Sequence, residues 1–183
     1  MNNADQIEYW NGPAGQKWVD QSDRLDAMLA PFADKVIAAA DLKPGESVMD
    51  IGCGAGALTL LAAAEVGDEH GALGVDVSAP LIALARARAA TAKAPARFEL
   101  ADASVFTAPD PVDIVISRFG VMFFEDPAAA FANIRQSVKP GGRMAFACWQ
   151  ALGVNDWALA PFQAAMPFFK EAPAPADPTA PGP

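Results

Sequence analysis

The chain has 183 residues, of which 52% are hydrophobic and 19% are charged, which predicts one folded domain and excludes a fully disordered chain. The formal net charge of −9 argues against sequence-independent binding to nucleic acid, because nucleic acid is itself a polyanion. With two cysteines and one histidine, the sequence predicts no metal site. It also lacks a signal-peptide pattern and any apolar run of about 18 residues, so we expect a cytoplasmic protein without stable membrane insertion.

The first 21 residues are expected to form short helical pieces around a Gly-Pro turn, and they carry three large aromatic side chains. Tyr9 and Trp18 are candidate substrate contacts, as parts of a lid over the site. The alternative is that they, together with Trp10, only attach this segment to the rest of the domain, since large aromatic residues serve both purposes.

A longer helix is predicted from Ser22, because apolar residues then recur at steps of three and four positions. Pro31 lies within this pattern and should kink or split the helix. A Lys-Pro-Gly turn at residues 43–45 should end it. We therefore assign residues 1–45 to an N-terminal helical segment or lid.

Strand and helix patterns alternate over the next part of the chain, residues 46–150. Strands are predicted at 47–51, 72–76, 97–100, 112–117 and 143–149, and helices at 57–66, 78–93 and 126–138. A Lys-Pro-Gly-Gly turn is expected at 139–142, before the fifth strand. Such alternation predicts an α/β fold, a doubly wound, mostly parallel Rossmann-like sheet with helices on both faces and five recognisable strands.

The pattern weakens after this core. In residues 151–183 we expect a partial cap helix over about 157–169, interrupted by two prolines, and then a proline-rich tail from 171 onwards.

Candidate site residues follow the predicted strands, at the edge where open α/β sheets bind their ligands. A glycine loop with Gly52, Gly54 and Gly56 joins the first strand to a helix, and glycine there lets a ligand approach main-chain N–H groups. Its GxGxG spacing differs from the GxGxxG of dinucleotide sites. Asp50, just before the loop, would repel a pyrophosphate and suits a cationic or zwitterionic ligand instead.

Acidic residues follow the second and third strands. Asp76 could accept hydrogen bonds from both hydroxyls of a ribose, and Asp102 could accept one from an adenine amino group. Ser117 and Arg118 end the fourth strand, where the ligand crevice should lie. Arg118 could position an acidic or phenolic acceptor, or it could pair with a nearby acid.

Taken together, these stretches resemble the class I S-adenosylmethionine-dependent methyltransferases, and most closely the small-molecule enzymes of ubiquinone and menaquinone biosynthesis. The resemblance covers about residues 10–150 and implies S-adenosyl-L-methionine as cofactor and S-adenosyl-L-homocysteine as product. The cofactor contacts that it implies are Asp50, Gly52, Cys53, Gly54, Gly56, Asp76, Val77, Asp102, Ala103 and Ser117.

Each part of the cofactor has implied partners in that family. The glycine loop would surround the methionine part, Asp76 would hold the ribose, and Asp102 with Ala103 would meet the adenine. Asp50 would lie near the amino group and Ser117 near the sulfonium.

The implied reaction is methyl transfer to a small organic acceptor, apolar or quinone-like, by in-line displacement. Candidate acceptor contacts are Arg118, Trp18 and Tyr9, and no catalytic residue is assigned. One alternative is a cofactor-binding or scaffold protein, or a truncated methyltransferase without turnover. An NAD-dependent oxidoreductase is a further alternative, which the GxGxG spacing disfavours.

The family normally has seven strands, with the last two beside the fifth, and the C-terminal strands are not recognisable here. The fifth strand would then be an exposed edge, which tends to pair with another chain. We expect a homodimer through the fifth strand or the C-terminal helix, unless the helix near 157–169 covers this edge.

Overall fold

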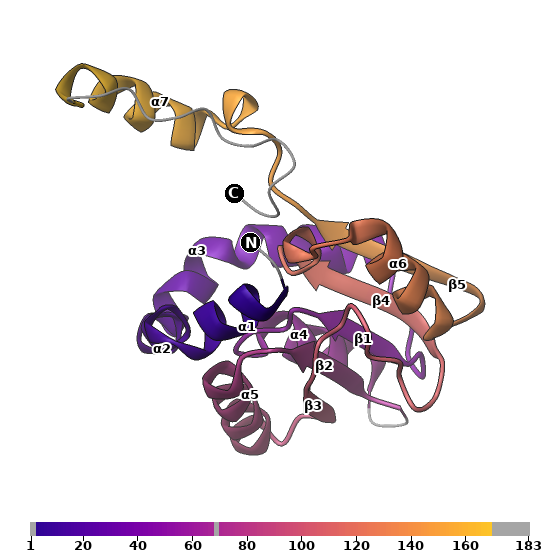
Figure 1. Ribbon diagram of the computed structural model, residues 1–183. Coiled ribbons are helices and arrows are strands. Elements are labelled where there is room, and N and C mark those ends of the chain that lie inside the picture. The colour runs from indigo at the N-terminus through magenta and orange to yellow at the C-terminus, as the bar shows by residue number, and fades with distance from the viewer. Residues whose placement is uncertain (1–2, 68–69, 170–183) are drawn as a thin grey trace.

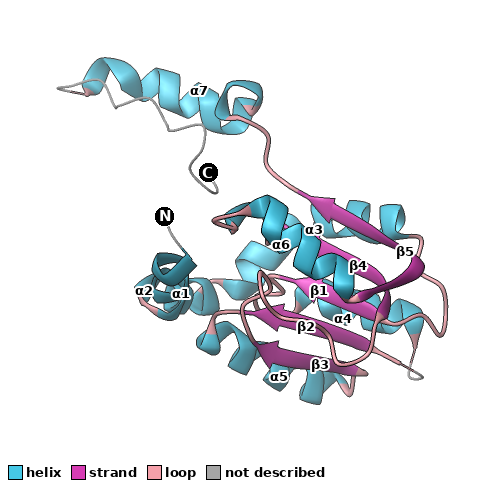
Figure 2. Cartoon of the chain, turned by 45° about the vertical axis from the view of Figure 1, so that its right-hand side comes forward, coloured by secondary structure: helices cyan, strands magenta, loops and turns pink. Residues whose placement is uncertain are grey.

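A single parallel sheet organises the molecule, which we describe from a computed structural model for residues 3–67 and 70–169 (Figures 1 and 2). Its strand order is β3-β2-β1-β4-β5. The strands are β1 (Val48–Ile51), β2 (Ala72–Asp76), β3 (Ala96–Leu100), β4 (Val112–Arg118) and β5 (Val138–Ala147). All four neighbouring pairs are parallel, which confirms the predicted fold class.

Helices lie on both faces of this sheet. They are α1 (Asn3–Asn11), α2 (Pro13–Asp20), α3 (Ser22–Ala40), α4 (Ala57–Val66), α5 (Ala79–Ala92), α6 (Pro127–Gln136) and α7 (Asp156–Ala165). Short 3-10 turns are η1 (Val121–Phe123), η2 (Leu152–Val154) and η3 (Met166–Phe168). One core cluster joins α3 and α4 to the central strands, and a second joins the opposite face to α6.

The central strands are apolar on both faces because each face packs against helices. Side chains of β1 alternate between the two core clusters, with Val48 in one and Met49 in the other. The chain passes from β1 outwards to β3 and then returns to the other side of β1 as β4. The order of strands therefore reverses at β1 and β4, and a doubly wound sheet opens its ligand crevice at such a point.

Pro31 does not split α3, which is one helix from Ser22 to Ala40. Of the two predicted outcomes, the split was wrong, and the kink stays a prediction. Proline removes only one main-chain donor, while the face with Ala33, Val36 and Ala40 is buried against the sheet. Leu29, before Pro31, is buried as well, so packing on both sides of the proline holds the helix in one element.

The Lys-Pro-Gly-Gly stretch at 139–142 is not a free turn before the fifth strand but lies inside β5. Val112 pairs with Val138 and Ile114 with Arg143, so four residues of β5 face a single residue of β4. This is a large bulge, in which Gly141 takes a φ of +81°. The helix before it also ends earlier than predicted, at Gln136.

The segment after β5 extends away from the sheet and carries α7 (Figures 1 and 2). No residue of α7 is buried, and its main contacts are with η2 and η3. The expected helix is therefore present, whereas the expected proline-rich tail lies outside the described residues. Within the described ranges, no helix is long and apolar enough to cross a membrane.

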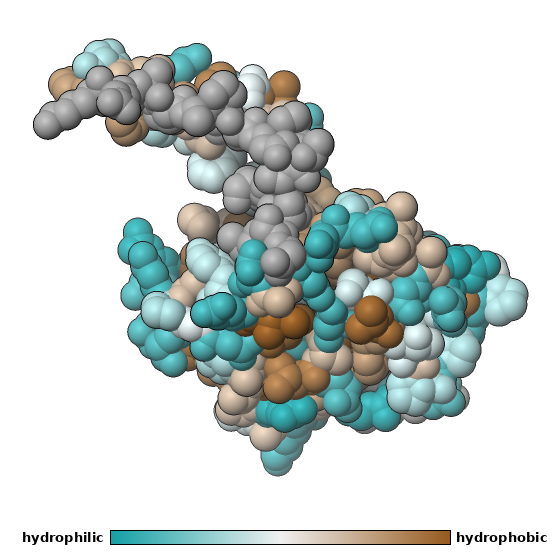
Figure 3. Space-filling model, in the orientation of Figure 1, coloured by the Kyte–Doolittle hydropathy of each residue, from teal (hydrophilic) through white to brown (hydrophobic). Residues whose placement is uncertain are grey.

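The face of the molecule drawn in Figure 3 mixes polar side chains (teal) with apolar ones (tan and brown). Leu100 and Val105 are 51% and 75% exposed at the end of β3 and in the loop that follows. Isolated exposed residues of this kind are common in folded proteins and define no binding surface by themselves.

Candidate functional site

A cavity of about 640 Å³ lies at the carboxyl ends of the central strands, where the reversal of strand order predicts it. Its walls include the glycine loop, the ends of β2 and β4, the loop after β3 and the N-terminal helices. The charged residues among its described lining are Asp26, Asp50, Asp76, Asp102 and Arg118. Four carboxyl groups against one guanidinium suit a ligand that carries positive charge.

The three glycines of the loop all have a positive φ, but their surroundings differ. At Gly52 an added Cβ would lie 2.6 Å from the Cα of Gly120, so the loop passes directly over the end of β4. At Gly56 it would lie 2.9 Å from the ring of Phe98, which packs under the loop. At Gly54 an added Cβ would meet nothing within 4 Å, and this residue lines the cavity. Gly54 therefore leaves space for a ligand, while Gly56, which is not a lining residue, permits close packing.

Asp76 ties the glycine loop to β2. One carboxylate oxygen accepts the N–H of Gly54 at 2.8 Å, and the other accepts the N–H of Ser78 at 2.8 Å. Burial raises the pKa of Asp76 above its ordinary value, although these two N–H groups favour the charged form. A carboxylate has about four acceptor positions, so Asp76 can also accept hydrogen bonds from a ligand in the cavity.

Asp50 is 1% exposed, and one of its two carboxylate oxygens lacks a partner. Oδ2 accepts a hydrogen bond from the Thr59 hydroxyl at 2.6 Å, whereas Oδ1 accepts none within the described part of the chain. Burial raises the pKa of Asp50 to about 7, against the opposing effects of Thr59 and of the Arg118 charge. A buried acceptor at the wall of a cavity is well placed to receive an N–H or ammonium group of a ligand.

Asp102 and its neighbours form the opposite end of the cavity. Oδ1 of Asp102 accepts the N–H of Ser104 at 2.9 Å, and Oδ2 accepts a hydrogen bond from the side chain of Asn3. Ala103 and Val77 also line the cavity. The contact with Asn3 shows that α1 reaches across to the loop after β3.

The N-terminal helices close one side of the cavity. Trp10 accepts a hydrogen bond from the Ser78 hydroxyl through its main-chain oxygen, at 2.7 Å, and Asn11 donates to the main-chain oxygen of Val77 at 2.8 Å. The ring of Trp10 packs edge-on against Tyr9 and Trp18, at 5.2 and 5.5 Å between centroids. Because Tyr9 and Trp18 also line the cavity, these residues both attach the segment and contribute to the site wall.

Ser117 is buried behind the wall and is not a lining residue. Its hydroxyl donates to the main-chain oxygen of Ile51 at 2.7 Å and accepts the N–H of Gly120 at 3.1 Å. Ser117 thus joins the ends of β1 and β4, and its expected place beside a sulfonium stays a prediction. Cys53 lines the cavity but is largely buried, and burial raises the pKa of its thiol well above the ordinary value, which disfavours the thiolate.

Arg118 pairs with an acid, as one of the two sequence-based interpretations proposed. Its Nη2 lies 3.2 Å from Oδ1 of Asp26, a residue of α3. Asp26 in turn receives Nη1 of Arg88, from α5, at 2.8 Å. No sequence pattern indicates Asp26 as the partner, because it lies 92 positions before Arg118 within an ordinary helical pattern.

An aromatic wall, formed by Phe119, Trp149 and Trp157, was also missed by the sequence analysis. All three residues line the cavity. The rings of Phe119 and Trp149 stack with centroids 4.4 Å apart and planes 5° apart, and Trp157 packs on Trp149 at 5.1 Å. Phe119 has a φ of +65°, a conformation that costs about 1–3 kcal/mol for a residue with a side chain.

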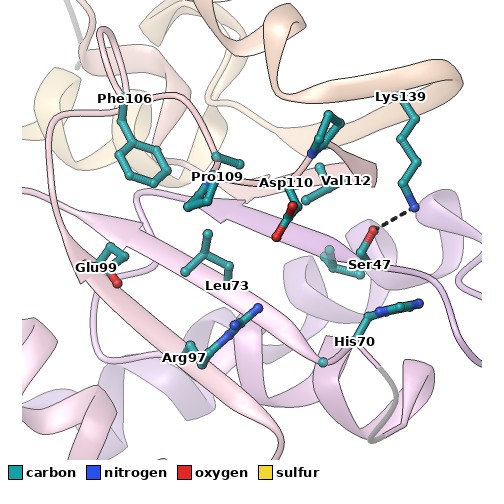
Figure 4. A pocket seen from close by; sticks show the side chains of 14 residues that line it. Ser47, His70, Leu73, Arg97, Glu99, Phe106, Pro109, Asp110, Val112 and Lys139 are labelled. Atoms are coloured by element: carbon teal, nitrogen blue, oxygen red, sulfur yellow. Dashed lines mark hydrogen bonds between the residues drawn. The ribbon is translucent and has the colours of Figure 1, made fainter.

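A second cavity, of about 490 Å³, lies at the opposite edge of the sheet, at the amino ends of β1 and β4 (Figure 4). Its lining includes two basic residues, Arg97 and Lys139, and two acidic residues, Glu99 and Asp110. Lys139 is already paired with Asp113 at 2.8 Å, and its ammonium also donates to the Ser47 hydroxyl at 3.3 Å. None of the site residues predicted from the sequence lines this second cavity. Among the described residues, no cluster of side chains is suited to hold a metal ion.

The fold and this cavity define a Rossmann-like domain with a ligand site at the carboxyl edge of its sheet. Residues 48–142 match the family described as Methyltransferase domain, and the chain belongs to this family. The predicted class of protein, a class I methyltransferase, is thereby confirmed.

Individual relatives agree with this assignment. The chain is 36% identical over 105 residues to a phosphoethanolamine N-methyltransferase of Triticum aestivum, a match over 57% of this chain and 20% of the wheat protein. It thus spans about a fifth of the length of that relative.

Solved structures show the same fold. A methyltransferase from Aquifex aeolicus, described as S-adenosylmethionine-dependent, superposes with a TM-score of 0.59 at 20% identity, over 82% of this chain and 74% of that one. A second such enzyme, from Geobacter sulfurreducens in complex with S-adenosyl-L-homocysteine, gives 0.53 at 26% identity, over 63% of this chain and 47% of that one. These likenesses support S-adenosyl-L-methionine as the cofactor.

Proposed function

We propose that this chain binds S-adenosyl-L-methionine in the cavity at the carboxyl edge of the sheet and transfers its methyl group to a small organic acceptor. The observation that carries the proposal is the open space over Gly54 beside a buried, unpartnered oxygen of Asp50. A cofactor with a cationic amino group would fill the space and supply the missing partner.

The remaining contacts follow from the cavity wall. Asp76 would accept hydrogen bonds from the ribose hydroxyls, with Val77 beside it, and Asp102 with Ala103 would meet the adenine. Asn3 now bonds to Asp102, so an adenine amino group would share that carboxylate or displace the amide. The N-terminal helices would then cover the bound cofactor and exclude water.

The protein's part in this reaction is mainly to hold the two reactants in line. The bound sulfonium supplies an activated methyl group, so the barrier falls chiefly through correct positioning of donor and acceptor. The glycine loop and the acidic residues would fix the donor. The aromatic wall would hold the acceptor against it and keep the reacting atoms out of water.

The acceptor that best fits this wall is a flat, apolar molecule that carries a ring. Stacked aromatic side chains favour other rings, with about 0.5–1.5 kcal/mol per pair beyond the burial of area. Phe119 and Trp149 offer such side chains at the ends of β4 and β5. This lining also fits the resemblance to the methyltransferases of ubiquinone and menaquinone biosynthesis, and the wheat relative shows that N-methylation is a reaction known among similar proteins.

Calorimetric titration with S-adenosyl-L-homocysteine tests the cofactor site. We expect the Asp76→Asn substitution to lower its affinity by about 1–3 kcal/mol, because the neutral amide loses charge-assisted hydrogen bonds to the ribose. Asp110→Asn, at the second cavity, is the matched control and should leave the affinity unchanged. Equal affinities for the wild type and Asp76→Asn would contradict the ribose assignment.

The same protein then allows turnover to be tested. Transfer of a labelled methyl group to any of a set of ring-bearing acceptors would support the proposed reaction. Binding without transfer would favour the alternative of a cofactor-binding protein without turnover. Tighter binding of NAD than of S-adenosyl-L-homocysteine would favour an oxidoreductase instead.

A further inference from the structure

Arg118 and Asp50 place opposite charges on the wall of one cavity without pairing with each other. Both residues line the cavity, yet within the described residues they form no ion pair at 4 Å or less. They are nevertheless close enough for the charge of Arg118 to lower the pKa of Asp50. A cavity wall with both charges can bind a group that itself carries both charges.

The guanidinium of Arg118 has N–H donors that its contact with Asp26 does not use. Its side chain is only 13% exposed, and Asp26 is its hydrogen-bond partner, through Nη2. A guanidinium has five N–H donors in a fixed plane, so an edge remains for a second, bidentate acceptor. The carboxylate is the group that matches this edge best.

Asp26 orients Arg118 and binds Arg88 at the same time, so its carboxylate is shared between two arginines. Nη1 of Arg88 lies 2.8 Å from Asp26 and donates at 3.3 Å to the main-chain oxygen of Ala55, in the glycine loop. Nη2 of Arg88 contacts Asp23 at 2.8 Å. One carboxylate thus orients two guanidinium groups and links α3 to the glycine loop and to the end of β4.

We propose that Arg118 binds the carboxylate of the methionine part of the cofactor, so that Asp50 and Arg118 together recognise its α-amino acid group. This inference rests on the proposed function, and it places Arg118 at the cofactor instead of at the acceptor. An α-amino acid carries its ammonium and its carboxylate on one carbon. A site that binds both groups needs an anion and a cation on the wall of one cavity, and Asp50 and Arg118 provide them.

Two ligands separate this contact from the rest of the site. S-adenosyl-L-homocysteine carries the amino acid group, whereas 5′-methylthioadenosine has the same adenosine and sulfur but lacks that group. We expect Arg118→Met to weaken binding of the first ligand by about ten- to a hundredfold, since a hydrogen-bonded charge pair is lost. Binding of the second should stay within about twofold, so the ratio of the two affinities falls.

Two further variants control for folding and for charge alone. Arg118→Lys keeps the charge but loses the bidentate geometry, and we expect an intermediate ratio. It also serves as the second test if the Met variant does not fold. Arg86→Met removes another arginine of the domain, which donates to the main-chain oxygen of Phe98, and it should not change the ratio.

The outcomes are distinguishable. An equal loss of affinity for both ligands would show that Arg118 only supports the structure and would overturn the assignment. An unchanged ratio together with a raised KM for an acidic acceptor would overturn it in favour of an acceptor contact. If the wild type bound neither ligand, the proposed function would fail, and this inference would fail with it.

Discussion

The carboxyl group of Asp50 links the protonation of the protein to its stability. In the folded chain burial raises its pKa to about 7, from an ordinary value of 3.8. Between these two values the folded state binds more protons than the unfolded state. Stability is therefore greatest at the acid end of this window and falls as the pH rises through about 7.

Asp50→Asn should remove this pH dependence. Asparagine keeps the shape and can still accept the hydrogen bond from Thr59, but it carries no charge at any pH. We expect the free energy of unfolding of the wild type to decrease between about pH 5 and pH 8, and that of the variant to decrease less. Urea unfolding at a series of pH values measures both.

A control variant separates the effect of Asp50 from any effect of the histidine. His70→Gln removes the single histidine of the chain. If the decline with pH is unchanged in Asp50→Asn and disappears in His70→Gln, the effect belongs to the histidine, and the interpretation of Asp50 is wrong.

Several site residues could be located from the sequence because position along a strand decides which edge a residue occupies. Asp50, Gly54, Asp76 and Asp102 all end strands or follow them, and all of them line the cavity. Local pattern does not reveal which way a side chain turns, and Ser117 faces the main chain of β1 instead. Contacts between elements far apart in the sequence are equally hidden, so the partner of Arg118 in α3 could not be foreseen.

Gly54 and Gly56 lie in different surroundings, so the same substitution to alanine should have different effects at the two positions. Alanine at Gly54 or Gly56 must adopt a left-handed φ, at a cost of about 1–3 kcal/mol. At Gly56 the new methyl group would also press on Phe98, so Gly56→Ala should destabilise the protein more. At Gly54 it would project into open space in the cavity, so Gly54→Ala should weaken binding of S-adenosyl-L-homocysteine more.

Thermal unfolding and calorimetric titration of both variants measure these two effects. Gly141→Ala is the control, because Gly141 also has a positive φ and no atom within 4 Å of an added Cβ, but it lies in the bulge of β5. It should lose stability by strain alone and bind the ligand normally. The opposite ranking of the two loop variants would contradict the roles that we assign to their glycines.

The order and type of the core elements follow from hydrophobic periodicity, whereas two details depend on tertiary packing. The bulge at 139–142 looks like a turn because Pro and Gly disfavour regular strands. It remains within β5 because the strand re-pairs with β4 from Arg143 onwards. Pro31 is tolerated for a similar reason, since Leu29 before it and Ala33 after it are both buried and hold α3 against the domain.

At the scale of the whole molecule, β5 is an edge strand of the sheet. It pairs with β4 on one side, and within the described chain it has no strand on the other. The expected cover by the helix near 157–169 is absent among the described residues, since α7 contacts mainly η2 and η3. Phe146, on β5, is 48% exposed. An uncovered edge with apolar side chains favours pairing with a second chain.

We therefore expect this chain to self-associate through β5, and light scattering over a range of concentrations should show a dimer. Phe146→Lys should shift the equilibrium toward the monomer, because a charge on an edge strand opposes pairing. Leu100→Lys places the same charge on the other edge strand, β3, and should have little effect. Phe168→Lys, at an 86% exposed position after α7, tests the alternative that the C-terminal helix forms the contact. A wild type that stays monomeric, or a dimer that only Phe168→Lys dissociates, would rule out pairing through β5.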